Sequence, residues 1–296
     1  MFQIRIYMKI FMIFALITVL SFGLFAEEQS STQKGTKNMD AILLVTFGTS
    51  DPEAKKAFVN IEKLARAKFP VYEIRWAYTS EMIRRNLAKK GEILLSPEEA
   101  LLKLKEDGFK NVYAQSLHII PGEEFHQVVA TVVKFKKDFD KLIISPPLLN
   151  SMADVKKSVK LMLSKVPTER KKEDAVLFMG HGSGKHPSDM IYVAAAYEIE
   201  KSDGNAFLAT VEGNPTLDDV LAGLKGKKVR KAYLLPFMSV AGDHAKNDMA
   251  GSEPDSWKSI LAKNGIESAP VMKGMAEYDE IVEIWLEHLE KTIKGL

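Results

Sequence analysis

The stretch "AILLVTFGTS" (residues 41–50) runs through seven apolar or β-branched residues and ends in a glycine turn. A short run of this kind is typical of a buried strand in a parallel sheet. The residues that follow, 52–68, place apolar side chains on one face at helical spacing. The stretch therefore predicts a strand, a tight turn and a helix, which together form the repeating unit of an α/β fold.

The same unit recurs along the chain. Strands are predicted at 72–78, 111–120, 141–149, 175–179, 206–212 and 232–238, and helices at 80–91 and 96–108. The second of these helices begins with a capping-box pair, Ser96 and Glu99. Apolar strands that alternate with amphipathic helices predict parallel sheets covered on both faces. The expected fold class is α/β.

The second half of the chain repeats the first. "LVTFGTS" (44–50) aligns with "FMGHGSG" (178–184), and "SLHIIPGEEF" (116–125) aligns with "PFMSVAGDHA" (236–245). Both matches fall where a predicted strand ends. In open parallel sheets, ligands bind outside the carboxyl ends of the strands. We therefore expect two similar domains whose strand ends line a cleft between them.

The expected domains are 39–170 and 171–296, and residues 1–38 precede them. Arg5 and Lys9 stand before a nearly unbroken apolar run that is followed by a polar linker. This pattern predicts a secretory signal peptide, and hence a periplasmic protein. An uncleaved membrane anchor is the alternative, because about 20 apolar residues can span a bilayer.

The composition is that of an ordinary globular protein, with 46% hydrophobic and 27% charged residues among 296. Without Arg5 and Lys9 the formal charge of +2 falls to zero. A neutral body lacks the basic field that nucleic-acid binding requires. The chain has no cysteine, so any metal site must use histidine and carboxylate.

Three side chains at predicted strand ends in the second half are candidate metal ligands: His181, Glu212 and His244. The aligned positions of the first half hold Phe47 and Glu124 in place of the two histidines, so the repeated fold itself needs no histidine there. Two imidazoles and one carboxylate suit a divalent ion such as Co²⁺, Fe²⁺, Ni²⁺ or Zn²⁺ and leave positions open for chemistry. The alternative is that each histidine is only a hydrogen-bonded turn residue.

Other residues are weaker candidates. His118 stands at a strand end of the first half, where a substrate contact, a base or a structural role is open. Ser50 ends a glycine turn at a helix N-terminus that could hold an anion. His126 falls in the next helix and is a candidate ligand for a second metal or a haem at a subunit contact, or a solvated surface residue.

Two other classes of enzyme fit poorly. The sequence has neither the Gly-x-Gly-x-x-Gly fingerprint nor a Walker lysine, so no nucleotide is expected. Ser183 in "GHGSG" lacks the Gly-x-Ser-x-Gly pattern of a hydrolase nucleophile.

The strings "AILLVTFGTS", "AYTSEMIRRNL", "AQSLHIIPGEEF", "VLFMGHGSGKH", "VEGNP" and "LLPFMSVAGDHAKNDMAG" resemble, in that order, the anaerobic-type sirohydrochlorin cobaltochelatases. These are ATP-independent class II chelatases related in fold to ferrochelatase. The resemblance runs from Met39 to the C-terminal helix and implies two α/β domains around a cleft. It also implies a metal held by His181, Glu212 and His244.

The implied reaction is insertion of Co²⁺, or Fe²⁺, into sirohydrochlorin, a step of cobalamin synthesis. His181 or His244 would take a pyrrole proton when it is not ligating the metal. Lys185 is a candidate partner for the acidic arms of the macrocycle, as are Arg75 and two arginines of the helix at 80–91.

The export segment departs from the family pattern, because corrin-ring synthesis is expected in the cytoplasm. An exported metal or tetrapyrrole carrier and an iron chelatase for sirohaem or haem formation are the alternatives. A homo-oligomer is also compatible with the sequence.

Overall fold

The structure of the chain, a computed structural model, describes residues 39–184, 186–224 and 226–296. The predicted signal peptide and linker (1–38) and Lys185 lie outside the described residues. Within the described ranges, no helix combines the length and the apolar character that a membrane crossing requires.

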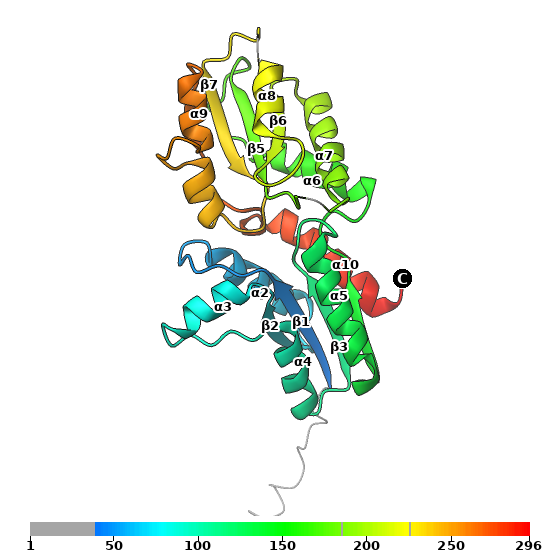
Figure 1. The fold of residues 1–296 in the computed structure, drawn as a ribbon. Helices are drawn as coiled ribbons and strands as arrows, with labels where there is room; N and C mark the ends of the chain where they lie inside the picture. Colours follow the sequence, from blue (N-terminus) through cyan, green and yellow to red (C-terminus); the bar gives the residue numbers. More distant parts are fainter. Residues whose placement is uncertain (1–38, 185, 225) are drawn as a thin grey trace, which may run out of the picture. The chain divides into compact units, whose positions relative to one another are not determined.

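Two four-stranded parallel sheets form the framework (Figure 1). The first has the order β2-β1-β3-β4 and the second the order β6-β5-β7-β8, so the strand order of one half repeats in the other. The α/β fold class and the internal duplication are thereby confirmed. The strands are β1 (Asp40–Thr46), β2 (Glu73–Tyr78), β3 (Asn111–Ser116), β4 (Lys141–Ser145), β5 (Ala175–Gly180), β6 (Ala206–Thr210), β7 (Lys231–Pro236) and β8 (Glu267–Pro270).

Helices cover both faces of each sheet. They are α2 (Lys56–Lys68), α3 (Glu81–Ala88), α4 (Pro97–Glu106), α5 (Glu123–Phe135), α6 (Met152–Leu163), α7 (Asp189–Ser202), α8 (Leu217–Leu224), α9 (Trp257–Lys263) and α10 (Asp279–Lys294). The predicted capping box opens α4, where Ser96 Oγ accepts from Glu99 N at 3.2 Å and the Glu99 carboxylate accepts from Ser96 N at 2.7 Å. The central strands β1 and β5 are almost wholly buried, as their continuous apolar runs require.

The last helix lies against the first sheet, although it follows the second one in the chain. α10 contacts α2, β3 and β4, and α6 contacts α7 of the second half. Trp285 of α10 is fully buried, and its Nε1 donates a hydrogen bond to the His118 carbonyl at 3.2 Å. Residues 39–296 form one compact unit, in which these helices join the two halves. The domain limits 39–170 and 171–296 therefore stay a prediction.

Several predicted boundaries were wrong by a few residues. The strand expected over 111–120 ends at Ser116, and the one expected over 206–212 ends at Thr210. Beyond Thr210 the chain bends, and the N–H groups of Val211 and Glu212 bond to the carbonyls of Gly180 and His181 at 3.0 and 2.9 Å. The short strand β8 was not predicted from its sequence.

Candidate functional site

A cavity of about 610 Å³ is lined by loops from both halves. The loops that follow β1 and β3 supply one wall, and those that follow β5, β6 and β7 supply the other. All five leave the carboxyl ends of parallel strands, where ligand sites of such sheets are found. The volume lies in the range of sites for drug-sized ligands and cofactors.

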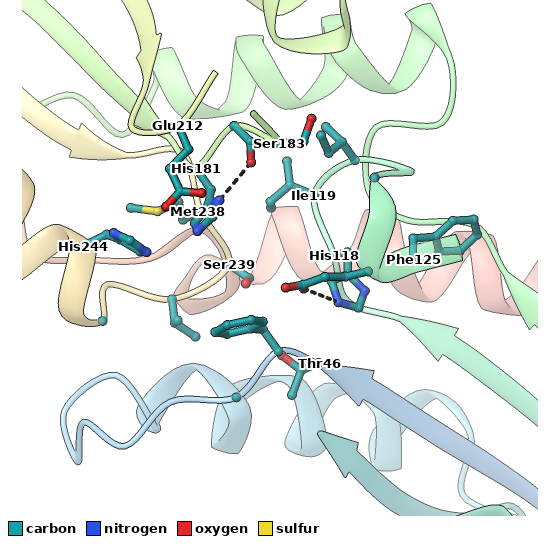
Figure 2. Close-up of a pocket in the computed structure, with 18 of the residues that line it drawn as sticks. Thr46, His118, Ile119, Phe125, His181, Ser183, Glu212, Met238, Ser239 and His244 are labelled. Atoms are coloured by element: carbon teal, nitrogen blue, oxygen red, sulfur yellow. Dashed lines mark hydrogen bonds and ion pairs between the residues drawn. The ribbon is translucent and has the colours of Figure 1, made fainter. Parts of the chain in front are cut away.

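The wall from the second half carries His181, Glu212 and His244. Figure 2 shows these side chains gathered on one side of the cavity beside Met238. The rings of His181 and His244 are nearly perpendicular, with centroids 4.7 Å apart. Within the described part of the chain, however, no three histidine or acidic side chains form a ready cluster for a metal. The structure thus brings the three predicted ligands to one cavity, and their joint coordination of an ion stays a prediction.

A tight junction holds the loops of His181 and Glu212 together. Gly182 has a φ of +83°, and a Cβ at this position would lie 2.7 Å from the backbone nitrogen of Gly213. A Cβ on Gly213 would in turn lie 2.8 Å from Cγ of Asp189. Only glycine at both positions lets the two loops approach this closely.

Asp189, at the start of α7, is the carboxylate at the centre of that junction. It is 8% exposed and accepts hydrogen bonds from Ser183 N at 2.8 Å, Ser183 Oγ at 2.6 Å and Asn214 N at 3.2 Å. It therefore ties the loop of His181 to the loop of Glu212. Sequence reasoning missed this residue, because an acidic residue in the first turn of a helix is ordinarily explained by the helix dipole alone.

Both histidines of this wall have an oxygen acceptor at Nδ1. His181 Nδ1 lies 2.9 Å from the carbonyl oxygen of Gly182, and His244 Nδ1 lies 2.6 Å from Oδ2 of Asp248. These acceptors assign the proton of each neutral ring to Nδ1. The lone pair of Nε2 is then free in each ring, which is what binding a metal ion or accepting a proton requires.

The opposite wall presents a second histidine and carboxylate. His118 Nε2 lies 3.2 Å from Oε2 of Glu124, a contact with the distance of an ion pair but without hydrogen-bond geometry. The Nδ1 atom of the same ring lies 2.9 Å from Ser116 Oγ. The His118 side chain is only 10% exposed, and Figure 2 shows it across the cavity from His181. His118 and Glu124 both line the cavity, and the substrate or base role of His118 stays a prediction.

The remaining predicted site residues lie elsewhere. Ser50 is not among the residues that line the cavity. The next residue, Asp51, accepts hydrogen bonds from the N–H groups of Glu53 and Ala54. His126 is exposed on α5, with its ring 5.2 Å from that of His186. Its role as a second metal or haem ligand stays a prediction.

The arginines proposed for the acidic arms of a macrocycle are engaged in ion pairs. Arg75 Nε lies 2.7 Å from Glu73 and Arg84 lies 3.5 Å from Glu99, while Arg85 pairs with Glu81. Among the described residues, the cavity lining includes neither lysine nor arginine. Lys185, the other candidate, lies outside the described residues.

Solved structures with this fold include metal chelatases. SirB from Bacillus subtilis with Fe³⁺ matches with a TM-score of 0.58 at 14% identity, covering 86% of this chain and 97% of that chain. CbiX, described as the terminal enzyme for biosynthesis of siroheme in denitrifying bacteria, matches with a TM-score of 0.51 at 16% identity, covering 86% and 99% of the two chains. At these identities the likeness shows the fold alone, and that fold is the one of the metal chelatases.

Comparison of sequences finds relatives of higher identity than these solved structures. It is 38% identical over 257 residues to the sirohydrochlorin cobaltochelatase CbiKC of Nitratidesulfovibrio vulgaris, covering 86% of this chain and 91% of that protein. It is 34% identical to the sirohydrochlorin cobaltochelatase of Salmonella typhimurium, covering 86% and 96%. The model of the family described as cobalt chelatase (CbiK) matches residues 40–294. The chain belongs to this family, as its resemblance in sequence implied.

Proposed function

We propose that the chain inserts Co²⁺ into sirohydrochlorin, with the ion and the macrocycle both as substrates. Membership of the cobalt chelatase family supports the reaction. The observation that carries the proposal is that histidines line both sides of a cavity of cofactor size. His181 and His244 lie together on one side, and His118 lies with Glu124 on the other.

The two sides of the cavity suit the two parts of the reaction, which are delivery of the metal ion and removal of the protons. Metal insertion exchanges one divalent cation for the two inner N–H protons of the macrocycle. His181, Glu212 and His244 would strip water from the ion and present it to one face of the ring, since imidazole and carboxylate suit a borderline ion. A neutral imidazole is also a suitable proton acceptor near pH 7.

The first wall offers a separate route for the protons. His118 lines the cavity with its Nε2 3.2 Å from Oε2 of Glu124, and imidazole and carboxylate side chains are the usual general bases of enzymes. Metal binding and proton acceptance would then use different side chains, and His181 or His244 need not leave the ion to act as the base. A cleft between two halves would also favour a bent macrocycle, which exposes the nitrogen lone pairs and resembles the transition state.

The metal and the compartment are further parts of the proposal. Fe²⁺ is the alternative ion, because a histidine and carboxylate site does not separate it from Co²⁺ by ligand chemistry alone. The apolar run near the N-terminus supports export to the periplasm. An exported carrier that binds metal or tetrapyrrole without turnover is the second candidate, and the predicted export segment fits it equally well.

One assay separates these candidates and tests the site. The protein is incubated with excess Co²⁺ and sirohydrochlorin, and the absorbance change of the macrocycle is followed. Many product equivalents per chain indicate an enzyme, whereas one equivalent indicates a carrier. The same assay with Fe²⁺ compares kcat/KM for the two ions.

His244→Ala is expected to lower kcat/KM for Co²⁺ by at least about 100-fold, since it removes a direct ligand. Asp255→Ala is the control, because Asp255 is exposed and outside the cavity lining. Turnover by His244→Ala close to that of the control would remove His244 from the mechanism.

A further inference from the structure

We propose that Asp248 is a positioning residue for His244, holding its imidazole in the tautomer and orientation that direct Nε2 at the metal ion. The inference rests on the proposed function, in which His244 binds the ion. Asp248 is not among the residues that line the cavity, and it acts only through the ring.

The contact is built into one turn of the chain. His244 stands directly before a π-helical turn, η2 (Ala245–Met249), and Asp248 is its partner four residues on. The Nδ1 to Oδ2 distance of 2.6 Å is that of a short hydrogen bond to a charged acceptor. Because an ionised carboxylate can only accept, the proton of the neutral ring must reside on Nδ1.

The three histidines that line the cavity differ in the partner of Nδ1. Nδ1 of His181 faces a neutral backbone carbonyl, and Nδ1 of His118 faces the hydroxyl of Ser116. His244 alone among the three pairs Nδ1 with a carboxylate. A carboxylate behind a ligating imidazole fixes the ring and strengthens the other nitrogen as a ligand, and its loss costs 10- to 100-fold in metal affinity or activity.

The backbone of this turn is held by contacts that do not involve the Asp248 side chain. Ala245 and Met249 are fully buried. Lys246 forms an ion pair with Asp51 of the first half. By contrast, the His244 and Asp248 side chains are 37% and 45% exposed, and exposed pairs of this kind add little to stability. The contact therefore matters for where the ring points more than for whether the protein folds.

The test compares Asp248→Ala and Asp248→Asn with wild type, with Asp255→Asn as control. Asp255 is an exposed acid seven positions further along, outside the cavity lining. The full chain is titrated with Co²⁺ alone, and binding is read from the visible absorption of the bound ion. Insertion kinetics with varied Co²⁺ and varied sirohydrochlorin follow. The tautomer of His244 is read from its ¹⁵N chemical shifts.

Asp248→Ala is expected to weaken Co²⁺ binding and raise KM for Co²⁺ by about 10- to 100-fold, with KM for the macrocycle unchanged. Asp248→Asn should lose less, because its amide oxygen can still accept from Nδ1. Co²⁺ affinity in Asp248→Ala within twofold of the control, or an unchanged His244 tautomer, overturns the inference. Absence of insertion by wild type would overturn the proposed function instead, and the Co²⁺ titration and tautomer would still test the role of Asp248.

Discussion

Gly213→Ala should break the junction between the loops of His181 and Glu212. The new Cβ would lie 2.8 Å from Cγ of Asp189, with one of the carboxylate oxygens closer still. Because Asp189 is buried and is held by Ser183 and Asn214, either its carboxylate or the loop backbone must move.

The size of the effect follows from the bonds at risk. A hydrogen bond to a charged group contributes about 1.5–3 kcal/mol. Losing one of the bonds to Asp189, together with overpacking of about 1–3 kcal/mol, suggests a destabilisation of roughly 4 kcal/mol. For a protein of this size that corresponds to a fall in Tm of roughly 8–16 °C. Since the same movement displaces His181 or Glu212, kcat/KM for Co²⁺ should also fall, by about 100-fold for a 1 Å displacement.

Gly204→Ala is the matched control, because among the described residues a Cβ at Gly204 meets no heavy atom within 4 Å. Thermal unfolding followed by circular dichroism gives Tm for both variants, and cobalt insertion gives kcat/KM. Gly204→Ala should stay within about 0.5 kcal/mol of wild type. If Gly213→Ala has the same Tm as the control and retains its activity, the junction does not position the two loops, and the reasoning from close approach is refuted.

Two further predictions concern the contacts that join the halves. Burial tends to raise the pKa of Asp51, but the bonds from Lys246, Glu53 and Ala54 outweigh it and leave that pKa below its usual value. The carboxylate therefore stabilises the fold above the unfolded pKa of about 4 and loses this contribution as the pH falls through the folded pKa. Asp51→Asn should accordingly be less stable than wild type in urea at pH 7, with a gap that narrows below about pH 4, and a gap that is independent of pH would contradict this. Trp285→Ala should cost about 3–5 kcal/mol in urea unfolding, because it empties a fully buried site between α10 and the first sheet. Tyr197→Ala, at a side chain that is 63% exposed, is its control, and equal midpoints for the two would count against the packing argument.

Much of the site was accessible from local patterns. Apolar runs before glycine turns located β1 and β5. Comparing the two halves singled out His181 and His244 as residues that the repeated fold does not need. Both histidines do line one cavity. The contact between His244 and Asp248 could also have been predicted, because residues four apart lie close together on a helix. That prediction requires a helical turn at this position, which the sequence did not indicate.

The α/β class could be predicted from the sequence alone, because apolar periodicity, turn residues and helix caps act over a few neighbouring positions. The internal repeat came from aligning the two halves, and the family came from the resemblance of whole strings of residues. Tertiary structure alone decided which distant groups meet. It set His118 against Glu124, placed Asp189 between the loops of His181 and Glu212, laid α10 on the first sheet and left Ser50 off the cavity lining. These contacts depend on how loops from separate strands pack at the sheet edges, and no local pattern in the chain encodes that packing.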